Sequence, residues 1–559
     1  GQSGESAHEY GAVNTIVLVF VLAACMLVSY LLRKYKFYYI PESAACMMVG
    51  VVVGGIARLT SDAKELSFLK FHPNLFFFVL LPPIIFEAGY SLKKKHFFRN
   101  FSTIIMFAVL GTLVSTFIIG GLTFAFAKMG AINVDSTSPL ESLLFGALIS
   151  AVDPVATLSI IGNPELNCDP MLYSLVFGES VLNDAVSIVL FRTFAEFVGS
   201  SDVFSVNEIF LVIGRFIGIS LGSILIGVVI GLMCCLMCRL TDIREHEGYE
   251  VTVLLLFAYA SYGVAEAVSL SGIMALFFCG IVLSHYNWYN LSSDSQITSS
   301  AIFKSLASIS ETFVFAYMGV VLFTGEVGTW DPAFVFLAII FCLIARLFNT
   351  FPFSWLANIR RKRPIPRAMQ VVIWFAGLRG AIAFALAFNM PTPNKDWDRG
   401  VIISTTLAVV FFTTLVCGGL TEPLLRKLDM QGAGQRLESS ADESLVAYQL
   451  ATSDGVQPDR SEEHHRASGF HLKWKLFDRK YMKPYFGGAS RTTASRLSEE
   501  AELGAGAREL QTRAAEEAEE KTPQPSPRGA DASSDAALAV FGGPVATSAA
   551  SPLSPFQTT

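Results

Sequence analysis

Carboxylate and amide side chains occur in the middle of apolar segments of this chain. Glu179, Asn183 and Asp184 lie in the run FGESVLNDAVSIVL, and Asp153 lies in the run ISAVDPVAT. An ionisable residue deep in an apolar span costs at least a few kcal/mol, so it usually faces a cavity or a partner. A carboxylate that can bind either a proton or a hard monovalent cation lets the two ions compete for one site. The candidate ligands for Na⁺ or K⁺ are therefore the oxygens of Asp184, Asn183, Asp153, Ser180 and Thr157.

The spacing of these residues decides which partners they can reach. On a helix, positions 179 and 183 share one face, whereas position 184 points about 100° away from position 183. One helix can therefore offer Asp184 to a cavity and Glu179 to a neighbouring helix. Pro154 follows Asp153 and cannot continue a helical ladder, so it frees backbone carbonyls, as expected where a broken helix lines an ion site.

Four further ionisable residues lie in apolar segments. Arg346 and Arg379 are candidate counter-charges, and Glu266 and Glu311 are additional acids. Arginine stays charged and binds carboxylates in a bidentate manner, so it indicates a structural ion pair rather than a transported proton. For Glu266, Glu311 and Arg379, the favoured interpretation is an ion pair that packs helices. For the two aspartates, whose surroundings are more polar, an ion site is favoured.

The elements that must position these residues are membrane helices. Of the 559 residues, 52% are hydrophobic and 16% are charged, whereas a soluble domain carries roughly 25% charged residues. Apolar runs of spanning length recur from residue 11 to about residue 425, which excludes an ordinary soluble enzyme. We predict about thirteen helices, near residues 11–32, 40–57, 73–90, 101–127, 140–162, 171–198, 206–239, 249–268, 270–286, 301–324, 332–357, 368–390 and 400–425.

The basic residues predict the orientation of these helices, because cytoplasmic loops are enriched in lysine and arginine. Basic clusters near residues 33–36, 93–99 and 360–367 follow odd-numbered spans, whereas the loops 199–205 and 325–331 contain none. Loops after odd-numbered spans are therefore predicted to be cytoplasmic. We expect a lumenal or extracellular segment over residues 1–10, a transmembrane domain over 11–430 and a cytosolic regulatory tail over 431–559.

The tail is poor in large apolar residues and is predicted to be largely disordered. Its stretch 470–486 mixes aromatic and basic residues and could dock on the membrane domain or on anionic lipid. Regulatory proteins could bind this tail, although the sequence does not identify them.

Several classes of function are disfavoured. The formal net charge is −6, and no clustered basic surface for a nucleic acid is visible. The group Cys234, Cys235 and Cys238 lacks a second ligand pair, so it favours packing over metal binding. The predicted spans contain no Ser/His pair or metal-ligand set typical of an enzyme. A cation channel or a membrane-embedded pH sensor is the main alternative to an ion exchanger.

Four motifs, in this order, resemble those of the eukaryotic sodium/proton exchangers of the cation/proton antiporter superfamily. They are FFFVLLPPIIFEAGY at 76–90, AVDPVAT at 151–157, FGESVLNDAVSIVL at 177–190 and GLRGAIAF at 377–384. The resemblance implies an all-α, inverted-repeat antiporter fold with crossed broken helices. It also implies a homodimer, no cofactor, and an elevator-like exchange of Na⁺ or K⁺ for H⁺ that regulates cellular or organellar pH.

The resemblance also implies roles for individual residues. Asp184 is similar to the ion-binding carboxylate, Asn183 to its neutral partner and Asp153 to a nearby carboxylate. Glu179 and Arg346 resemble an interhelical ion pair. The Asn-Asp order resembles the electroneutral branch, which exchanges one cation for one proton.

Two narrower similarities concern inhibitors and location. The run at 76–85, together with a later acid, resembles the segments linked to amiloride-type inhibitors, which implies contacts at Phe77, Leu81, Pro82 and Glu266. The start of the second span at residues 40–43 and the tail run WKLFDRKYMKPYF are most similar to the Golgi and endosomal isoform eight group. They imply a Golgi or endosomal membrane rather than the plasma membrane. The preference between Na⁺ and K⁺ stays open.

Overall fold

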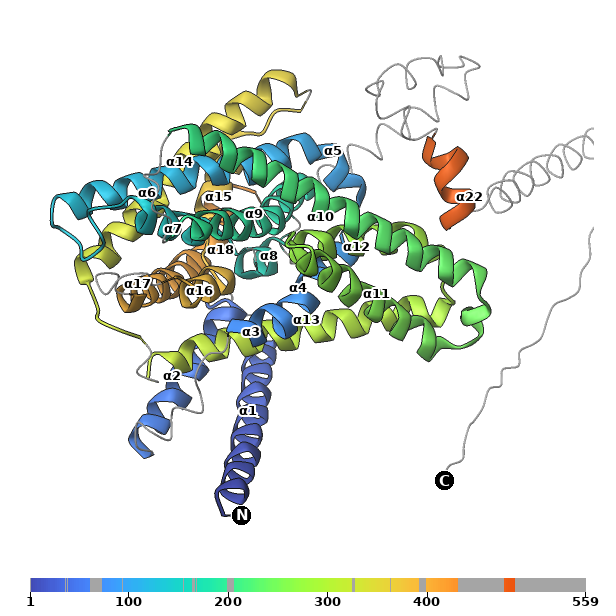
Figure 1. The fold of residues 1–559 in the computed structure, drawn as a ribbon, viewed down its shortest axis with the longest axis horizontal. Helices are drawn as coiled ribbons and strands as arrows, with labels where there is room; N and C mark the ends of the chain where they lie inside the picture. The colour runs from blue at the N-terminus through green and yellow to red at the C-terminus, as the bar shows by residue number, and fades with distance from the viewer. Residues whose placement is uncertain are drawn as a thin grey trace, which may run out of the picture. The chain divides into compact units, whose positions relative to one another are not determined.

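The structure is a computed structural model. It describes residues 2–35, 37, 39–60, 73–92, 94–153, 155–162, 166, 168–198, 206–323, 327–361, 363–391, 399–430 and 477–487. Within these residues it consists of helices and connecting segments, with no β-strand (Figure 1). Pro154 and the predicted tail residues 431–476 and 488–559 lie outside the described residues.

The first third of the chain forms long helical rods, two of which contain a wider π-helical turn. They are α1 (Gln2–Lys34), α2 (Glu42–Thr60), the rod α3 (Pro73–Leu75), η2 (Phe76–Leu80) and α4 (Leu81–Tyr90), and the rod α5 (Lys94–Ile105), η3 (Met106–Gly111) and α6 (Thr112–Lys128). Pro82 and Pro83 lack the N–H groups that would bond to the preceding turn, which accounts for the loosened ladder in η2.

The rest of the membrane domain contains both long and short helices. They are α7 (Leu140–Ile149), α8 (Val155–Ile161), α9 (Pro170–Glu196), α10 (Val206–Leu240), η4 (Asp242–Glu245), α11 (Glu247–Ala267), α12 (Gly272–Tyr286), η5 (Asn287–Tyr289), α13 (Ser293–Val321), α14 (Pro332–Arg360), α15 (Arg367–Phe375), α16 (Ala381–Phe388), α17 (Arg399–Phe412), η6 (Thr413–Cys417) and α18 (Gly418–Lys427).

Within the described ranges, nine helices are long and apolar enough to cross a membrane. The count of thirteen stays a prediction, because the predicted spans 140–162 and 368–390 are each broken into two short helices. Three helix starts differ from the prediction. Helix α5 begins at Lys94, before the predicted start at residue 101. Helix α1 already begins at Gln2, and α13 begins at Ser293 because the Ser292 side chain accepts a hydrogen bond from Ser295 N–H at 3.2 Å.

The two broken helices cross at their breaks. The backbone N–H of Asp153, between α7 and α8, donates to the carbonyl of Leu378, between α15 and α16, at 2.9 Å. The Asp153 side chain occupies the space that a Cβ at position 380 would need, so Gly380 permits the crossing. Each break therefore supplies backbone partners to the other.

The helices pack in two groups. The scaffold group contains α1–α4 and α10–α13, in which α13 packs along α2 and α12 packs along α4 and α10. Glycines allow this close packing: a Cβ on Gly50 would overlap the Ala316 carbonyl, and one on Gly319 would overlap the Met47 carbonyl. The ion-site group contains α5–α9 and α14–α18, where α6 packs on α7 and α14, and α9 packs on α5 and α7.

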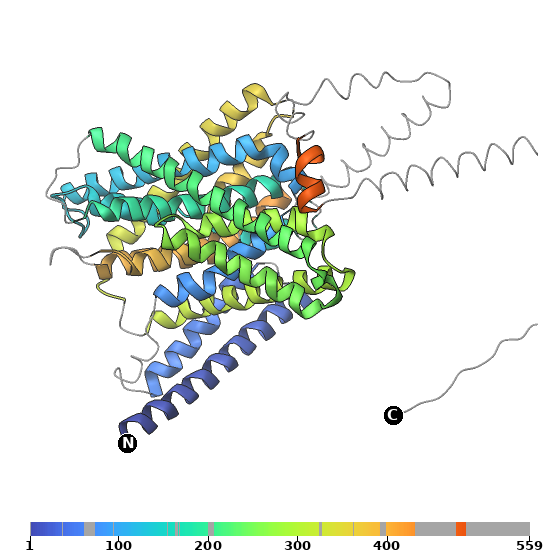
Figure 2. The ribbon, with the colours of Figure 1, turned by 45° about the vertical axis from the view of Figure 1, so that its right-hand side comes forward.

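A short segment of the tail is also described, comprising η7 (Asp478–Met482) and α22 (Lys483–Phe486). It lies against α10 and α12 (Figure 2). The Tyr286 hydroxyl donates to the Asp478 carboxylate at 2.6 Å, and the Asn290 amide donates to the Phe486 carbonyl at 2.9 Å. This part of the tail is therefore held on the ends of scaffold helices.

Candidate functional site

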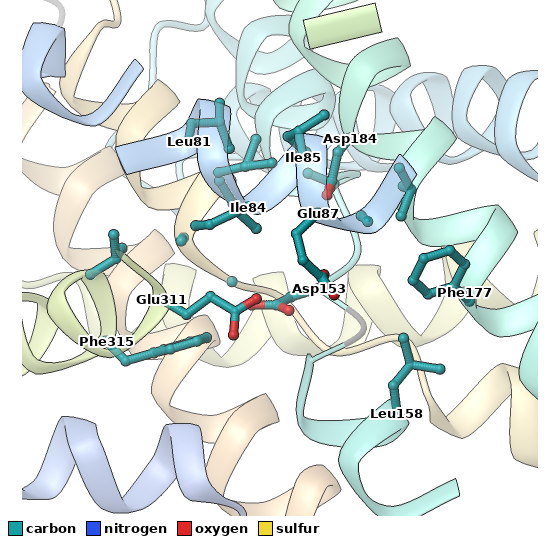
Figure 3. Close-up of a pocket in the computed structure, with 18 of the residues that line it drawn as sticks. Leu81, Ile84, Ile85, Glu87, Asp153, Leu158, Phe177, Asp184, Glu311 and Phe315 are labelled. Atoms are coloured by element: carbon teal, nitrogen blue, oxygen red, sulfur yellow. The ribbon is translucent and has the colours of Figure 1, made fainter. Parts of the chain in front are cut away.

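A cavity of about 350 Å³ lies between the two helix groups and is lined by four carboxylates (Figure 3). Asp153 and Asp184 come from the ion-site group, whereas Glu87 on α4 and Glu311 on α13 come from the scaffold group. Apolar side chains form much of the remaining wall, including Leu81, Ile85, Leu158, Phe177 and Phe315. The cavity is thus a mostly apolar chamber with a small number of acidic groups, as in sites that bind small ligands or ions.

Asp184 combines burial with the absence of a partner. It is 8% exposed and lines the cavity. Within the described residues it makes no hydrogen bond or ion pair. A buried carboxylate in this state needs a proton or a cation to offset its charge.

Asn183 is buried but does not line the cavity. Its side-chain oxygen accepts from Val152 N–H at 2.9 Å, and its amide group donates to the Thr112 hydroxyl at 2.6 Å. Because Thr112 donates its own proton to the Ala108 carbonyl at 2.6 Å, its oxygen must accept from Asn183. An ionised aspartate at position 183 could not supply that donor. The Asn183 amide therefore suits this position, where it joins α9 to the break after α7.

Two of the predicted oxygen ligands lie away from the cavity. The Ser180 hydroxyl donates to the Val176 carbonyl of its own helix at 2.9 Å. The Thr157 hydroxyl is fully buried, has no partner among the described residues and is not part of the cavity wall. Of the five predicted ligands, the structure brings only Asp153 and Asp184 to the cavity.

Glu179 and Arg346 form a buried ion pair between α9 and α14. Their side chains are 2% and 4% exposed, and Arg346 Nη2 lies 3.1 Å from Glu179 Oε2. The same Nη2 donates to the Ile373 carbonyl at 3.0 Å, which adds α15 to the contact. The pair therefore joins three helices of the ion-site group. Glu179 reaches a neighbouring helix while Asp184 reaches the cavity, as their spacing on α9 allows.

Among the residues that the structure describes, Arg379 and Glu311 do not form the packing ion pairs that the sequence favoured. Within the described residues, the Arg379 guanidinium donates instead to the carbonyls of Ser150 and Ala151, at 3.0 and 3.2 Å. Helix α7 ends at Ile149, so these carbonyls lack helical partners and mark the negative end of the helix. Glu311 faces the cavity. Arg379 thus contacts a broken helix, and Glu311 contacts the cavity. The sequence alone did not predict either contact.

Glu266 is in an ion pair with a residue of the other helix group. Its two carboxylate oxygens lie 3.0 and 3.2 Å from Nη1 of Arg192 on α9. One of these oxygens also accepts from Gly272 N–H at the start of α12, at 3.1 Å. Glu266 is thereby fixed to the scaffold group while it contacts the ion-site group.

The four residues predicted to contact inhibitors do not share one cavity. Leu81 lines the cavity described above, and Pro82 lines a separate small apolar pocket. Phe77 is buried and lines neither, and Glu266 pairs with Arg192. Proximity in sequence placed the first three on one rod, but successive residues of a helix point in different directions.

Sequence reasoning missed three charged residues that bear on the site. Glu87 and Lys304 line the cavity, and Arg192 joins the two groups. Glu87 and Arg192 lie in apolar runs, so the rule that selected Asp184 could have found them. Lys304 lies in a more polar stretch, and nothing local in the sequence indicated a cavity there.

Several known proteins are similar to this chain over most of its length. Residues 20–427 match the family described as "Sodium/hydrogen exchanger, transmembrane". The chain is 36% identical over 500 residues to "Sodium/hydrogen exchanger 8" of Mus musculus, covering 87% of this chain and 86% of that protein. It is 33% identical over 539 residues to "Sodium/hydrogen exchanger 9" of Rattus norvegicus, covering 87% and 82%.

The fold also matches a solved antiporter. The sodium proton antiporter MjNhaP1 from Methanocaldococcus jannaschii superposes with a TM-score of 0.55 at 18% identity, covering 76% of this chain and 98% of that structure. This match confirms the predicted antiporter fold class. The chain therefore belongs to the sodium/hydrogen exchanger family, and it is a multi-pass membrane antiporter of sodium ions and protons rather than an enzyme.

Proposed function

We propose that this chain exchanges one Na⁺ or K⁺ for one H⁺ at Asp184. The observation that carries the proposal is the buried, unpartnered state of this carboxylate within the described residues, in a cavity of about 350 Å³. One carboxylate can bind one proton or one monovalent cation, and the exchange leaves its charge unchanged. The neutral side chain of Asn183 adds no second negative charge, which supports a 1:1, electroneutral exchange.

The exchange proceeds by an elevator-like movement of the ion-site group against the scaffold group. Each group is packed mainly within itself, and the cavity lies between them. Asp184 and its supports, the crossed breaks and the Glu179–Arg346 pair, all belong to the ion-site group. Such an assembly can move as one body and carry the ion with it.

The cavity opens toward the cytosol. Glu87 lies near the end of α4, Tyr173 near the start of α9 and Lys304 in the first half of α13. These helix ends adjoin loops that the basic residues predict to be cytoplasmic. The described arrangement is then the inward-facing one, and the tail segment at residues 477–487 lies on the same side.

The protein works as a homodimer in a Golgi or endosomal membrane, where it regulates lumenal pH. Apolar side chains of α1 are exposed, among them Val19 at 58% and Phe20 at 71%. In a membrane such a face contacts lipid or another protein, and a second copy covers part of it. The organelle is inferred from similarity to the isoform eight group.

The test is proton flux in liposomes with a pH-sensitive dye. Wild type, Asp184→Asn and Glu196→Gln are compared during addition of Na⁺, K⁺ and Li⁺. Glu196 lies at the opposite end of α9, in an exposed pair with Arg215, and serves as the matched control. We expect cation-dependent flux in wild type and control, and none in Asp184→Asn. Equal flux in all three proteins would overturn the proposal.

A further inference from the structure

Glu311 is an acidic residue of the scaffold group without an assigned partner. It lies on α13, lines the cavity, and within the described residues makes no hydrogen bond or ion pair. Asp153 is the neighbouring acid whose charge acts most strongly on it. The two carboxylates lie beside each other in the cavity (Figure 3).

The backbones that carry these two carboxylates are both held in place. Asp153 is fixed by its hydrogen bond to Leu378 and by its packing on Gly380. The helix of Glu311 is fixed by the close contact of Gly319 with α2. Neither backbone can withdraw without disturbing its helix group, so the two acids meet wherever the groups adopt this arrangement.

Two neighbouring carboxylates in a confined space cannot both stay ionised without a proton or a cation between them. The charged and titratable side chains that face the cavity are Glu87, Asp153, Tyr173, Asp184, Lys304 and Glu311. Lys304 is exposed and lies closer to the start of α13. Arg379 bonds to the carbonyls at the end of α7. A proton or a monovalent cation between Asp153 and Glu311 supplies this compensation inside the cavity. Asp184, itself buried and unpartnered among these residues, indicates independently that the cavity receives ions.

We propose that Glu311 is an ion-binding residue supplied by the scaffold group, which shares one proton or one monovalent cation with Asp153 in this arrangement. The inference rests on the proposed function. Two carboxylates with one proton carry one net negative charge, and the same pair with one Na⁺ or K⁺ carries the same charge. Cation entry therefore releases one proton to the cavity water without a change in charge. Asp153 moves away from Glu311 when the ion-site group moves, so the shared site exists on one side only.

Glu311 then sets the affinity for ions that enter from the cavity side. Neutralising it removes one charged ligand but leaves Asp184 intact. We expect Glu311→Gln to raise the half-saturating cation concentration on the cavity side about tenfold, the scale of losing one charged partner. Half-saturation from the opposite side and the maximal rate should change little. Glu311→Asp keeps the charge and should recover most of the affinity.

The experiment measures Na⁺ binding and flux with purified, full-length protein. Calorimetric titration with Na⁺ in two buffers of different ionisation enthalpy counts the protons released per cation. Flux in liposomes of known orientation gives half-saturation from each side. Wild type, Glu311→Gln, Glu311→Asp and the control Glu196→Gln are compared, and thermal unfolding verifies that each variant is folded.

The outcomes separate the inference from the proposed function. A one-sided loss of affinity with fewer protons released, recovered by Glu311→Asp, supports the shared site. Wild-type values for Glu311→Gln on both sides would overturn it while leaving exchange at Asp184 intact. Equal losses on both sides, not recovered by Glu311→Asp, would make Glu311 structural and overturn it as well. A wild-type protein without any cation-dependent flux would refute the proposed function itself.

Discussion

The two helix groups of this exchanger stabilise themselves in different ways. The ion-site group is joined through buried polar contacts: the Glu179–Arg346 pair, the Arg379 contacts to α7 and the Asn183 contacts to the break. The scaffold group relies on close helix packing at small residues, such as Gly50 and Gly319. Crossed broken helices leave backbone groups that need polar partners, whereas continuous helices do not. The group that holds the ion site therefore carries its own polar framework, which fixes the break at Asp153 to the helix that bears Asp184.

The largest expected effect is on the polar framework. Glu179→Gln leaves Arg346 buried without a countercharge, so we expect a loss of about 3–5 kcal/mol of stability. Thermal and denaturant unfolding in detergent measure it, with the exposed Glu196→Gln as a matched control, for which about 0–1 kcal/mol is expected. Similar losses for the two variants would mean that the buried pair does not hold the ion-site group together.

The scaffold should respond to volume rather than to charge. Gly50→Ala adds a methyl group that overlaps the Ala316 carbonyl, whereas Gly55→Ala on the same helix meets only the Phe323 ring at 3.7 Å. We expect Gly50→Ala to cost about 1–3 kcal/mol, and Gly55→Ala to be nearly neutral. Unfolding of both variants tests this, and a neutral Gly50→Ala would refute the role of close packing.

A smaller effect is expected where the two groups meet. The Arg192–Glu266 pair is partly exposed, so it contributes at most about 1 kcal/mol to the described arrangement, or about fivefold in population. Arg192→Gln should therefore favour the alternative arrangement. A cysteine introduced by Val181→Cys lies in the cavity wall, so the rate at which an impermeant maleimide labels it reports on access to the cavity. We expect Arg192→Gln to slow this labelling several-fold. If Arg192→Gln and the control Arg215→Gln gave the same labelling rate, the Arg192–Glu266 pair would not stabilise the described arrangement of the two groups.

A further effect concerns pH. Lys94 precedes the apolar span His96–Lys128, and its ammonium donates to the Ser284 carbonyl of α12 at 2.5 Å. Burial lowers the pKa of Lys94 from 10.5 to about 8. Between these values the unfolded chain binds the proton and the folded chain does not, so stability rises with pH across this window.

Lys94→Met removes this titration. We therefore expect the unfolding free energy of wild type to rise relative to the variant between pH 8 and 10.5, with no difference in slope below pH 8. Denaturant unfolding over this range measures it. Parallel curves would show that the ammonium is not desolvated.

The sequence by itself determined the membrane class, the family, the approximate helix ranges and the acids that matter most. The length of an apolar run and the presence of an ionisable residue within it are local properties. They can be read from the sequence without knowledge of the rest of the fold. The spacing of Glu179 and Asp184 on one helix likewise predicted that they would face different neighbours.

Only the tertiary structure decided which groups meet. It brought Glu87 and Glu311 from the scaffold to the cavity, gave Glu266 the partner Arg192, and turned Asn183 and Ser180 away from the cavity. It also brought Arg379 to the carbonyl of Ser150, which lacks a helical partner because α7 ends there. Helix α7 is far from Arg379 in the sequence. Contacts of this kind depend on how helices far apart in sequence cross, and one sequence carries no local record of that crossing.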